Sequence, residues 1–312
     1  MVHQPTQRRA RLKGLTYYAI LFLVIASFSI AIVYFFHPTK NVDSQDSAEE
    51  NRTETELEST AEENPDNRGE GESLDLENVV ETWLADFSGS AGIFIQDLDE
   101  NTVLVDYNSD KYFSTASLYK LFVVYEGYSR IERGELDPDE LIANGQTLST
   151  CLDLAIRESN SACAETIWQL IGHDELDEIV RETYGIKNTF VSSLQSTPRD
   201  IATIMELFYK HADFSEETWQ KIADSMLNQP ITTYNWRQGL PSGFSVANVY
   251  NKVGWEHSGV GDLWLIYNDA SIVSFDELDR HFLVVVMTEN STVVEISDLG
   301  RQIENVILEF YQ

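Results

Sequence analysis

From residue 74 onward, apolar and polar positions follow two clear periods, which predict a series of helices and strands. The segment LENVVETWLADF has the apolar spacing of a helix, whereas AGIFIQDLDE and TVLVDYNS show the alternation of strands. A polar turn at 99–101 separates the two strand-like runs and predicts a hairpin. Helical spacing then returns in six segments, at 117–130, 147–157, 162–171, 175–184, 198–210 and 216–227. Three strand-like runs and a closing helical stretch follow, at 249–255, 263–269, 281–289 and 293–310.

This order of elements predicts an α/β fold of the α+β sandwich type. Two strands come first, a helical middle part follows, and three strands and one helix close the chain. Because short links join the last three strands, we expect them to pair antiparallel. The prediction for residues 74–312 is one domain, with a five-stranded antiparallel sheet, flanking helices and an all-helical lobe.

The N-terminal part predicts a membrane anchor. Residues 16–36 (TYYAILFLVIASFSIAIVYFF) carry no charge, and as a helix they would span about 30 Å, the thickness of a bilayer core. Arg and Lys residues within 1–15 precede the run and acidic sequence follows it, so the positive-inside rule places 1–15 in the cytoplasm and the C-terminal domain outside. A cleaved signal peptide is the alternative, but the following FFHPTKN offers no small-x-small cleavage site. We therefore expect an uncleaved signal-anchor and a single-pass protein of the cell membrane.

Residues 37–73 are predicted to be a linker. From Val42 they are rich in Glu, Asp, Asn, Ser and Thr and nearly free of apolar side chains, so they cannot bury enough surface to offset the entropy of ordering. We interpret them as an acidic, disordered tether with no binding role. The whole chain carries a net charge of -31 and has no basic stripe to neutralise phosphates, which argues against a nucleic-acid partner.

Neither cysteines nor histidines predict a metal site. Cys151 and Cys163 have no CxxC spacing, and we expect both to be unpaired core residues. The histidines lack ligand spacing; His257 could line a cleft rim, although a surface position is the plainer reading. DLDENTVLVDYN lacks the Gly and Glu of a calcium loop at its sixth and twelfth positions, so a plain hairpin is preferred. We expect no metal and no cofactor.

A serine and a lysine, Ser117 and Lys120, stand three residues apart in the apolar segment FSTASLYKLFVVYE. At the start of a helix the free backbone N–H groups would stabilise a serine oxyanion. Residue i+3 lies on the same helix face, and burial lowers the pKa of a lysine, so a neutral Lys120 could take the proton of Ser117. Taken alone, the pair is better explained as a helix-capping serine and a lysine that extends its amine to the surface.

Two further motifs favour the chemical interpretation. Ser159-Asn160-Ser161 lies between two apolar helical runs, and Lys252-Val253-Gly254 lies on a predicted strand. The order matches the S-x-x-K, S-D-N and K-T-G set. Residues 74–312 thereby resemble the class A β-lactamase and penicillin-recognising serine hydrolase superfamily, also in TLSTCLDLAIRESNSACAETI, STPRDIATIMELFY and LPSGFSVANVYNKVG. The resemblance implies a β-lactamase/transpeptidase-like fold.

The resemblance also implies a role for each matched residue. Ser117 would be the acylating nucleophile and Lys120 its base. Ser159 would lie between Lys120 and Lys252 and pass the proton to the leaving nitrogen. Lys252 would place positive charge next to the substrate carboxylate and help to keep Lys120 neutral. The backbone N–H groups of Ser117 and Trp255 would form the oxyanion hole, in which one donor is worth about 10²–10³ in rate.

The substrate-binding positions, Ser161, Val253 and Gly254, depart in part from the superfamily pattern. Ser161 stands where Asn is usual, so a hydroxyl replaces an amide that would hold the acylamino carbonyl of the substrate. Val253 stands where Thr or Ser is usual, so a hydroxyl that would bind the substrate carboxylate is lost. A hydrogen bond to a charged group is worth about 1.5–3 kcal/mol, so we expect ordinary penicillins to bind tenfold or more weakly.

A third departure concerns deacylation. A β-lactamase of this class needs an omega-loop Glu to activate the hydrolytic water. Between Tyr184 and Ser196 the chain reads GIKNTFVSSLQ, without a carboxylate. Glu182 is the nearest acid, and we expect it on a helix surface. The sequence therefore predicts an acyl-enzyme that forms and persists.

Together these features predict an extracytoplasmic, membrane-anchored serine hydrolase of β-lactamase-like or D,D-carboxypeptidase-like type. Its expected partners are the cell membrane and a small-molecule or peptidoglycan-type peptide substrate. A β-lactam or a D-amino-acid peptide would acylate Ser117, and deacylation would be slow. The alternatives are a catalytically degraded cell-wall-binding module on the same fold, or a protein in which the acidic segment alone matters as a surface spacer.

Overall fold

The computed structural model describes residues 74–143, 145–231 and 235–311. The predicted anchor at 16–36 and the predicted linker at 37–73 lie outside them. Within these described ranges, no helix is long and apolar enough to cross a bilayer.

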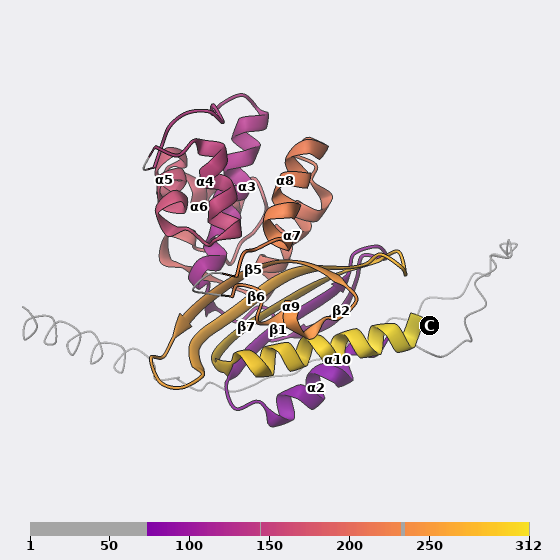
Figure 1. The fold of residues 1–312 in the computed structure, drawn as a ribbon. Helices are drawn as coiled ribbons and strands as arrows, with labels where there is room; N and C mark the ends of the chain where they lie inside the picture. Colours follow the sequence, from indigo (N-terminus) through magenta and orange to yellow (C-terminus); the bar gives the residue numbers. More distant parts are fainter. Residues whose placement is uncertain (1–73, 144, 232–234, 312) are drawn as a thin grey trace, which may run out of the picture. The chain divides into compact units, whose positions relative to one another are not determined.

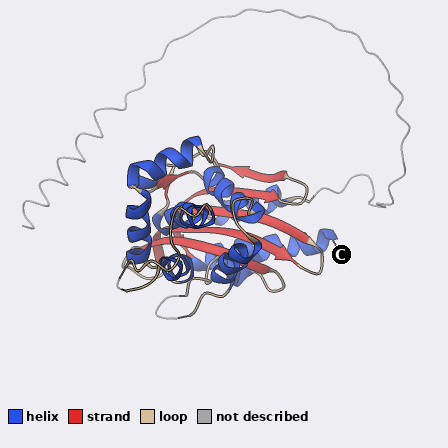
Figure 2. Cartoon of the chain, turned by 90° about the horizontal axis from the view of Figure 1, so that it is seen from above, coloured by secondary structure: helices blue, strands red, loops and turns tan. Residues whose placement is uncertain are grey.

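Five antiparallel strands form the central sheet, in the order β2-β1-β7-β6-β5 (Figure 1, Figure 2). The first two strands, β1 and β2, form the predicted hairpin, and Asn101 at its turn has a left-handed backbone (φ 53°). β5 is the last strand of the sheet, so one of its edges carries no further strand of that sheet. This architecture confirms the predicted fold class. The strands are β1 (Ser90–Asp97), β2 (Thr102–Tyr107), β5 (Asn248–His257), β6 (Leu263–Phe275) and β7 (Arg280–Thr292).

Helices cover both faces of the sheet (Figure 1). Two of them, α2 (Leu76–Asp86) and α10 (Val293–Tyr311), pack against one face, and the helical lobe lies on the other. The other helices are α3 (Tyr119–Glu132), α4 (Leu148–Arg157), α5 (Ser161–Ile171), α6 (His173–Glu182), α7 (Pro198–Lys210), α8 (Glu216–Leu227) and the short α9 (Leu240–Gly243).

The central strand β7 shows how one apolar run builds two cores. Successive strand residues point to opposite faces, so the continuous run from Leu283 to Met287 serves both. Leu283, Val285 and Met287 join the core under the helical lobe. Val284 and Val286 join the core under α2 and α10. All five side chains are fully buried.

Capping residues explain why two helix boundaries were predicted without error. Thr197 accepts a hydrogen bond from the backbone N–H of Asp200 at the start of α7, and Pro198 occupies its first turn. Ser215 accepts one from the N–H of Thr218 at the start of α8. Sequence periodicity missed the two-residue strands β3 (Phe113–Ser114) and β4 (Gln195–Ser196), which are too short to show a period.

The prediction of two unpaired cysteines is wrong. Cys151 on α4 and Cys163 on α5 form a disulfide, with their Cα atoms 4.9 Å apart. Both residues are buried, as expected, but α4 and α5 pack side by side across the turn at 158–160 and bring the two thiols together. The spacing of 12 residues resembles no common disulfide motif, so only the packing of the helix pair reveals it.

Candidate active site

Ser117 lies in a 3₁₀ turn, Ala116–Leu118, directly before α3, not in the first turn of the α-helix as predicted. Ala116 has a left-handed backbone (φ 42°), which a non-glycine residue adopts only where its surroundings hold it. The backbone N–H of Thr115 donates to the carbonyl of Leu194 at 2.8 Å. The turn therefore carries the serine on a tightly held backbone.

Lys120 is fully buried on the first turn of α3, and its Nζ faces three hydroxyl groups. The Nζ lies 3.1 Å from the Oγ atoms of Ser117, Ser159 and Ser161, and it donates to the backbone carbonyl of Ser159. Burial lowers the pKa of Lys120 from 10.5 to about 8, because removal from water disfavours the ammonium form. The amine is therefore neutral above about pH 8, and about a tenth of it is neutral and able to accept a proton at pH 7.

The turn between α4 and α5 places Ser159 next to this amine. Ser159 has a left-handed backbone (φ 52°) and is buried. Asn160 caps α5, accepting a hydrogen bond from the N–H of Cys163 at 3.0 Å, which confirms the prediction that Asn160 braces the turn.

Lys252 approaches Ser159 from the other side. It lies on β5, is 1% exposed, and its Nζ donates to Ser159 Oγ and to the carbonyl of Val253, both at 2.8 Å. Burial, and secondly the positive charge of Lys120, hold the pKa of Lys252 well below 10.5. The Ser159 hydroxyl thus contacts both lysines, as the resemblance implies, but the amine of Lys252 is enclosed and does not lie on an open surface.

Gly254 explains how β5 can lie against the Ser117 turn. A Cβ at this position would stand 2.3 Å from the carbonyl oxygen of Thr115, 2.8 Å from the N atom of Leu118 and 2.9 Å from the N atom of Ser117. Only glycine permits this approach. Trp255 follows Gly254 on the strand, and its part in an oxyanion hole stays a prediction.

The structure brings together most of the sequence-predicted site residues. Ser161 is exposed at the start of α5 and contacts Lys120, so its hydroxyl touches the predicted base in addition to facing outward. Val253 is 1% exposed, and its side chain points to the face of β5 opposite Lys252. His257 is exposed; its ring accepts from the N–H of Gly259 at 3.0 Å within the β5–β6 turn.

Sequence reasoning missed a buried polar cluster behind β5. The fully buried Asp269 accepts hydrogen bonds from Asn251 Nδ2, Ser271 Oγ and the N–H of Leu240, each at 3.1 Å. Burial raises the pKa of Asp269 to about 7. Asn251 directly precedes Lys252, so the cluster fixes the strand that carries the second lysine. The asparagine in "VYNKVG" was its only signal in the sequence.

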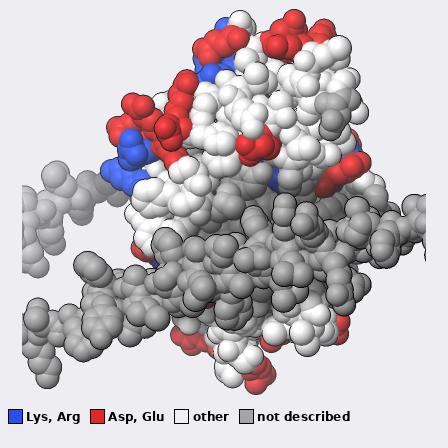
Figure 3. Space-filling view, turned by 90° about the vertical axis from the view of Figure 1, so that its left-hand side faces the viewer, with Lys and Arg blue, Asp and Glu red and all other residues white. Residues whose placement is uncertain are grey.

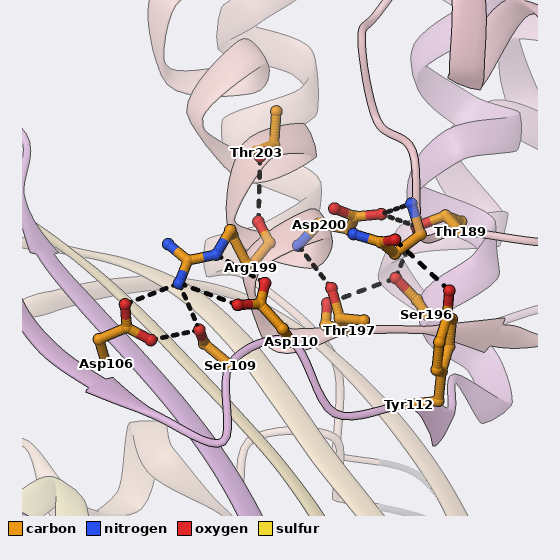
Figure 4. A network of polar contacts seen from close by, with 11 residues as sticks. Asp106, Ser109, Asp110, Tyr112, Thr189, Ser196, Thr197, Arg199, Asp200 and Thr203 are labelled. Carbon is orange, nitrogen blue, oxygen red and sulfur yellow. Dashed lines mark hydrogen bonds and ion pairs between the residues drawn. The ribbon is translucent and has the colours of Figure 1, made fainter. Parts of the chain in front are cut away.

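The short loop after α6 is held by a second network, shown in Figure 4. The carboxylate of Asp200, on α7, accepts from the N–H of Asn188 at 2.6 Å and from Thr189 Oγ1 at 3.0 Å. Thr189 also contacts the Oγ of the fully buried Ser196 at 2.7 Å. Ser196 pairs with Phe113 between β4 and β3, so the loop is joined to the strand that leads to Ser117.

Arg199 extends this network outward (Figure 4). Its guanidinium pairs with Asp106 at 2.6 Å and with Asp110 at 2.8 Å, and it donates to Ser109 Oγ at 2.7 Å. The end of β2, the following turn and α7 are thereby tied together.

The loop itself supplies no carboxylate, in agreement with the sequence. Asp177 on α6 reaches it, but its Oδ1 accepts from the N–H groups of Val191 and Ser192, and its Oδ2 accepts from the Ser192 hydroxyl. Glu182 has an exposed side chain (67%) paired with Arg181, which confirms its predicted surface position. The carboxylates that touch this loop are therefore engaged in holding its backbone.

A cavity of about 540 Å³ lies elsewhere, between α7, α8 and the sheet, lined by residues that include Tyr209, Trp219, Tyr250 and His281. None of the predicted site residues lines it. Carboxylates gather in several patches on the face of the molecule shown in Figure 3. Within the described ranges, no three His, Cys, Asp or Glu side chains are grouped as metal ligands would be.

A nucleophile turn and a lysine-bearing edge strand that meet around one shared serine hydroxyl are features of the β-lactamase and penicillin-binding-protein-like serine hydrolases. Residues 75–310 match the sequence profile of the β-lactamase enzyme family. The chain belongs to this family. No curated protein matches it.

Solved structures show the same fold at low sequence identity. PBP-A is 17% identical with a TM-score of 0.65, over 75% of this chain and 96% of PBP-A. A β-lactamase from Chitinophaga pinensis DSM 2588 is 13% identical with a TM-score of 0.66, over 76% and 99% of the two chains. A class A β-lactamase from Bacteroides cellulosilyticus DSM 14838 is 15% identical with a TM-score of 0.66, over 77% and 100%.

Proposed function

We propose that this family member is a membrane-anchored serine acyl hydrolase that acts outside the cytoplasm on a peptidoglycan-type peptide or a β-lactam, through a long-lived acyl-enzyme. The observation that carries the proposal is the buried amine of Lys120, 3.1 Å from Ser117 Oγ and with its pKa lowered to about 8. Lys120 is enclosed and has no partner carboxylate among the residues that the structure describes, which is costly, and its contact with a hydroxyl on a held turn gives it a chemical use.

The contacts support one path for the proton. Neutral Lys120 takes the proton of Ser117 as Oγ attacks the substrate carbonyl, so the Oγ–C bond forms and a tetrahedral oxyanion develops. The backbone N–H groups of Ser117 and Trp255 would stabilise that oxyanion. Lys120 then returns the proton through Ser159 Oγ to the leaving group as its bond to carbon breaks. Lys252 orients Ser159 for this transfer.

The departures in the loop and at the motif positions support slow turnover. With no carboxylate between Tyr184 and Ser196, no side chain of the loop can activate water as a general base, so the acyl group would stay on Ser117. A mutant of PBP-A has been solved as an acyl-enzyme complex with penicillin G, a species that this fold can therefore hold.

Two observations support the extracytoplasmic location. The uncharged run at 16–36 follows a basic N-terminus. The Cys151–Cys163 disulfide is typical of an oxidising compartment. The rival function, a catalytically degraded binding module, rests on Ser161, Val253 and the missing loop carboxylate, but gives no reason for two enclosed lysines around one hydroxyl.

The test is covalent labelling of the purified full chain. A fluorophosphonate serine probe and a fluorescent penicillin are applied in parallel, and we expect the first to label strongly and the second slowly. Ser117→Ala should remove both signals, whereas the exposed Ser193→Ala, a matched control in the loop after α6, should retain them. A folded protein that neither probe labels would favour the binding module instead.

A further inference from the structure

The cavity of about 540 Å³ between α7, α8 and the sheet takes no part in the proposed acylation chemistry. Its size is that of a small-molecule site, for which about 300–1,000 Å³ is usual. Three partly exposed aromatic side chains line it: Tyr209 near the end of α7, Trp219 on α8 and Tyr250 on β5. We call this space the aromatic cavity.

Contacts with neighbouring side chains hold two of these rings in place. Trp219 stacks on the ring of His211, with centroids 5.6 Å apart and planes inclined by only 4°. The ring of Tyr209 lies 5.5 Å from that of His281, and its hydroxyl donates to Asp99 Oδ1 at 3.3 Å. The wall of the cavity is therefore largely formed before a ligand binds, which lowers the entropy that binding must offset.

Carboxylates surround the aromatic cavity. Asp224 lines it directly, and Arg157 pairs with this carboxylate at 2.6 Å. Asp276 accepts a hydrogen bond at 2.7 Å from the hydroxyl of Ser274, which also lines the cavity. In the part of the chain that the structure describes, neither Asp99 nor Asp276 pairs with a lysine or an arginine. Their negative charge is therefore not offset there by such an ion pair.

This negative charge reaches the rings of the cavity. Burial, and secondly the charge of Asp99, raises the pKa of Tyr209 to about 12. Burial also raises the pKa of Tyr250, and the charge of Asp276 adds to the effect. Because the field that disfavours a phenolate favours a positive charge, a cation inside the cavity would be stabilised.

The lining of the cavity leaves this place open to a cation from outside. Among the described residues, those that line it include no lysine or arginine. Its two histidines face carboxylates: His281 Nδ1 lies 3.1 Å from Asp99, and His211 Nε2 lies 3.4 Å from Glu216. An anion would be repelled here, and so would the chain's own acidic segment at 37–73. An organic cation gains twice, because the faces of Tyr and Trp rings attract ammonium groups as well.

We propose that the aromatic cavity is a binding site for a small organic cation, in which an ammonium group is carried on an aromatic or apolar body. The ammonium lies against the ring faces of the cavity, and the body fills the rest of the space. One ring contributes roughly a 2- to 30-fold gain in affinity, depending on how far the contact is shielded from water. Because none of the motif residues lines the cavity, the proposal is independent of acylation at Ser117.

Two ligands of the same shape isolate the contribution of the charge. In para-trimethylammoniobenzyl alcohol a quaternary nitrogen stands where para-tert-butylbenzyl alcohol has a carbon, so only the first is charged. We call them the cationic alcohol and the neutral alcohol. Isothermal titration calorimetry of the purified full chain in detergent measures both affinities, with protein-free micelles as the blank.

We expect the cationic alcohol to bind about tenfold or more tightly than the neutral alcohol, and the difference to shrink as salt is added. Trp219→Ala and Tyr250→Ala should each weaken binding of the cationic alcohol roughly 2- to 30-fold, whereas Tyr250→Phe keeps the ring and should retain it. Tyr112→Ala, which removes an exposed tyrosine outside the cavity, is the control and should match the native affinity.

A second pair of variants tests the carboxylates. Asp276→Asn should lower the preference for the cationic over the neutral alcohol about 2- to 5-fold, because one negative charge beside the cavity is lost. Glu309→Gln removes an exposed acid on α10, against the other face of the sheet, and should leave the preference unchanged.

Equal affinities for the two alcohols would overturn the proposal, and so would the absence of binding by the cationic alcohol. The same holds if its affinity survives unchanged in both ring variants. Thermal denaturation shows whether each variant is folded. Should an alanine variant unfold, Trp219→Leu and Tyr250→Leu remove the ring face but keep most of the apolar volume, and the same loss of affinity is expected. Labelling of Ser117 by the fluorophosphonate probe reports separately on the proposed function.

Discussion

The proton-transfer residues and the aromatic cavity lie on the same face of the sheet but differ in how far they follow the superfamily motifs. All four motif residues are present. The Nζ of Lys120 lies 3.1 Å from the Oγ atoms of Ser117 and Ser159, and the Nζ of Lys252 lies 2.8 Å from Ser159 Oγ. The cavity shares the face because Tyr250 precedes Lys252 by two residues on β5, yet none of the motif residues lines it. The comparison teaches that chemistry and recognition are built by separate residues, so one can change while the other is kept.

Of the changes considered, replacing Lys120 is expected to have the largest effect on the rate of acylation. Lys120→Ala removes the proposed base and should lower the rate of acylation by the fluorescent penicillin about 10³-fold, leaving the affinity for the cationic alcohol unchanged. The growth of the labelled band with time measures the first quantity, and calorimetry measures the second. Lys221→Ala, an exposed lysine paired with Glu217 on α8, is the control and should match the native rate. A Lys120→Ala enzyme that keeps its rate would show that another group accepts the proton.

The candidate catalytic residues could be predicted because their motifs are local. Serine and lysine three apart on an apolar helix, and a serine between two helical runs, show their chemistry in the sequence itself. The fold followed from the same source, since the apolar runs of β7 and the caps of α7 and α8 are local features. The 3₁₀ turn at Ser117 was not predictable, because its left-handed Ala116 depends on the loop and on β5.

Contacts between segments that are distant in the chain could not be predicted from the sequence. Cys151 and Cys163 meet only because α4 and α5 pack together. Trp236 and Trp264 are far from each other in the chain, and their joint contact with Trp255 follows from the pairing of β5 with β6 and the approach of the segment before α9. Periodicity carries no information about such pairs.

Removing the Cys151–Cys163 disulfide is the second test, because the disulfide holds together the two helices that flank Ser159. The disulfide closes a segment of sequence separation 12 that contains Ser159, and a loop of this size contributes about 3 kcal/mol to the free energy of unfolding. The double change Cys151→Ala and Cys163→Ala should lower the denaturation midpoint accordingly. It should also slow acylation by the fluorescent penicillin, since the turn that holds Ser159 loosens. A change in the affinity for the cationic alcohol would instead link this turn to the aromatic cavity and break the separation.

The smallest expected effect is the dependence of the acylation rate on pH, which should follow the protonation of Lys120. The pKa of Lys120 is lowered from 10.5 to about 8, so its amine is neutral above this pH and charged below it. Acylation should therefore rise about tenfold per pH unit up to about pH 8 and level off above it. Tyr119, whose ring lies 5.7 Å from the Lys120 Nζ, stays neutral over this range because burial raises its pKa to about 12.

Lys252 and Asp269 are the other buried groups that face this region, and their effect on the profile can be separated from that of Lys120. Asp269, with its pKa raised to about 7, gains its charge as the pH rises through 7 and would favour the charged form of Lys252. Asp269→Asn removes that titration and should leave a single rise near pH 8. At physiological ionic strength, saturation with the cationic alcohol should leave this midpoint unchanged, because the aromatic cavity takes no part in deprotonating Ser117. A midpoint near 10.5 would mean that Lys120 is hydrated in solution, and a midpoint that the bound cation shifts would mean that recognition and proton transfer are coupled along β5.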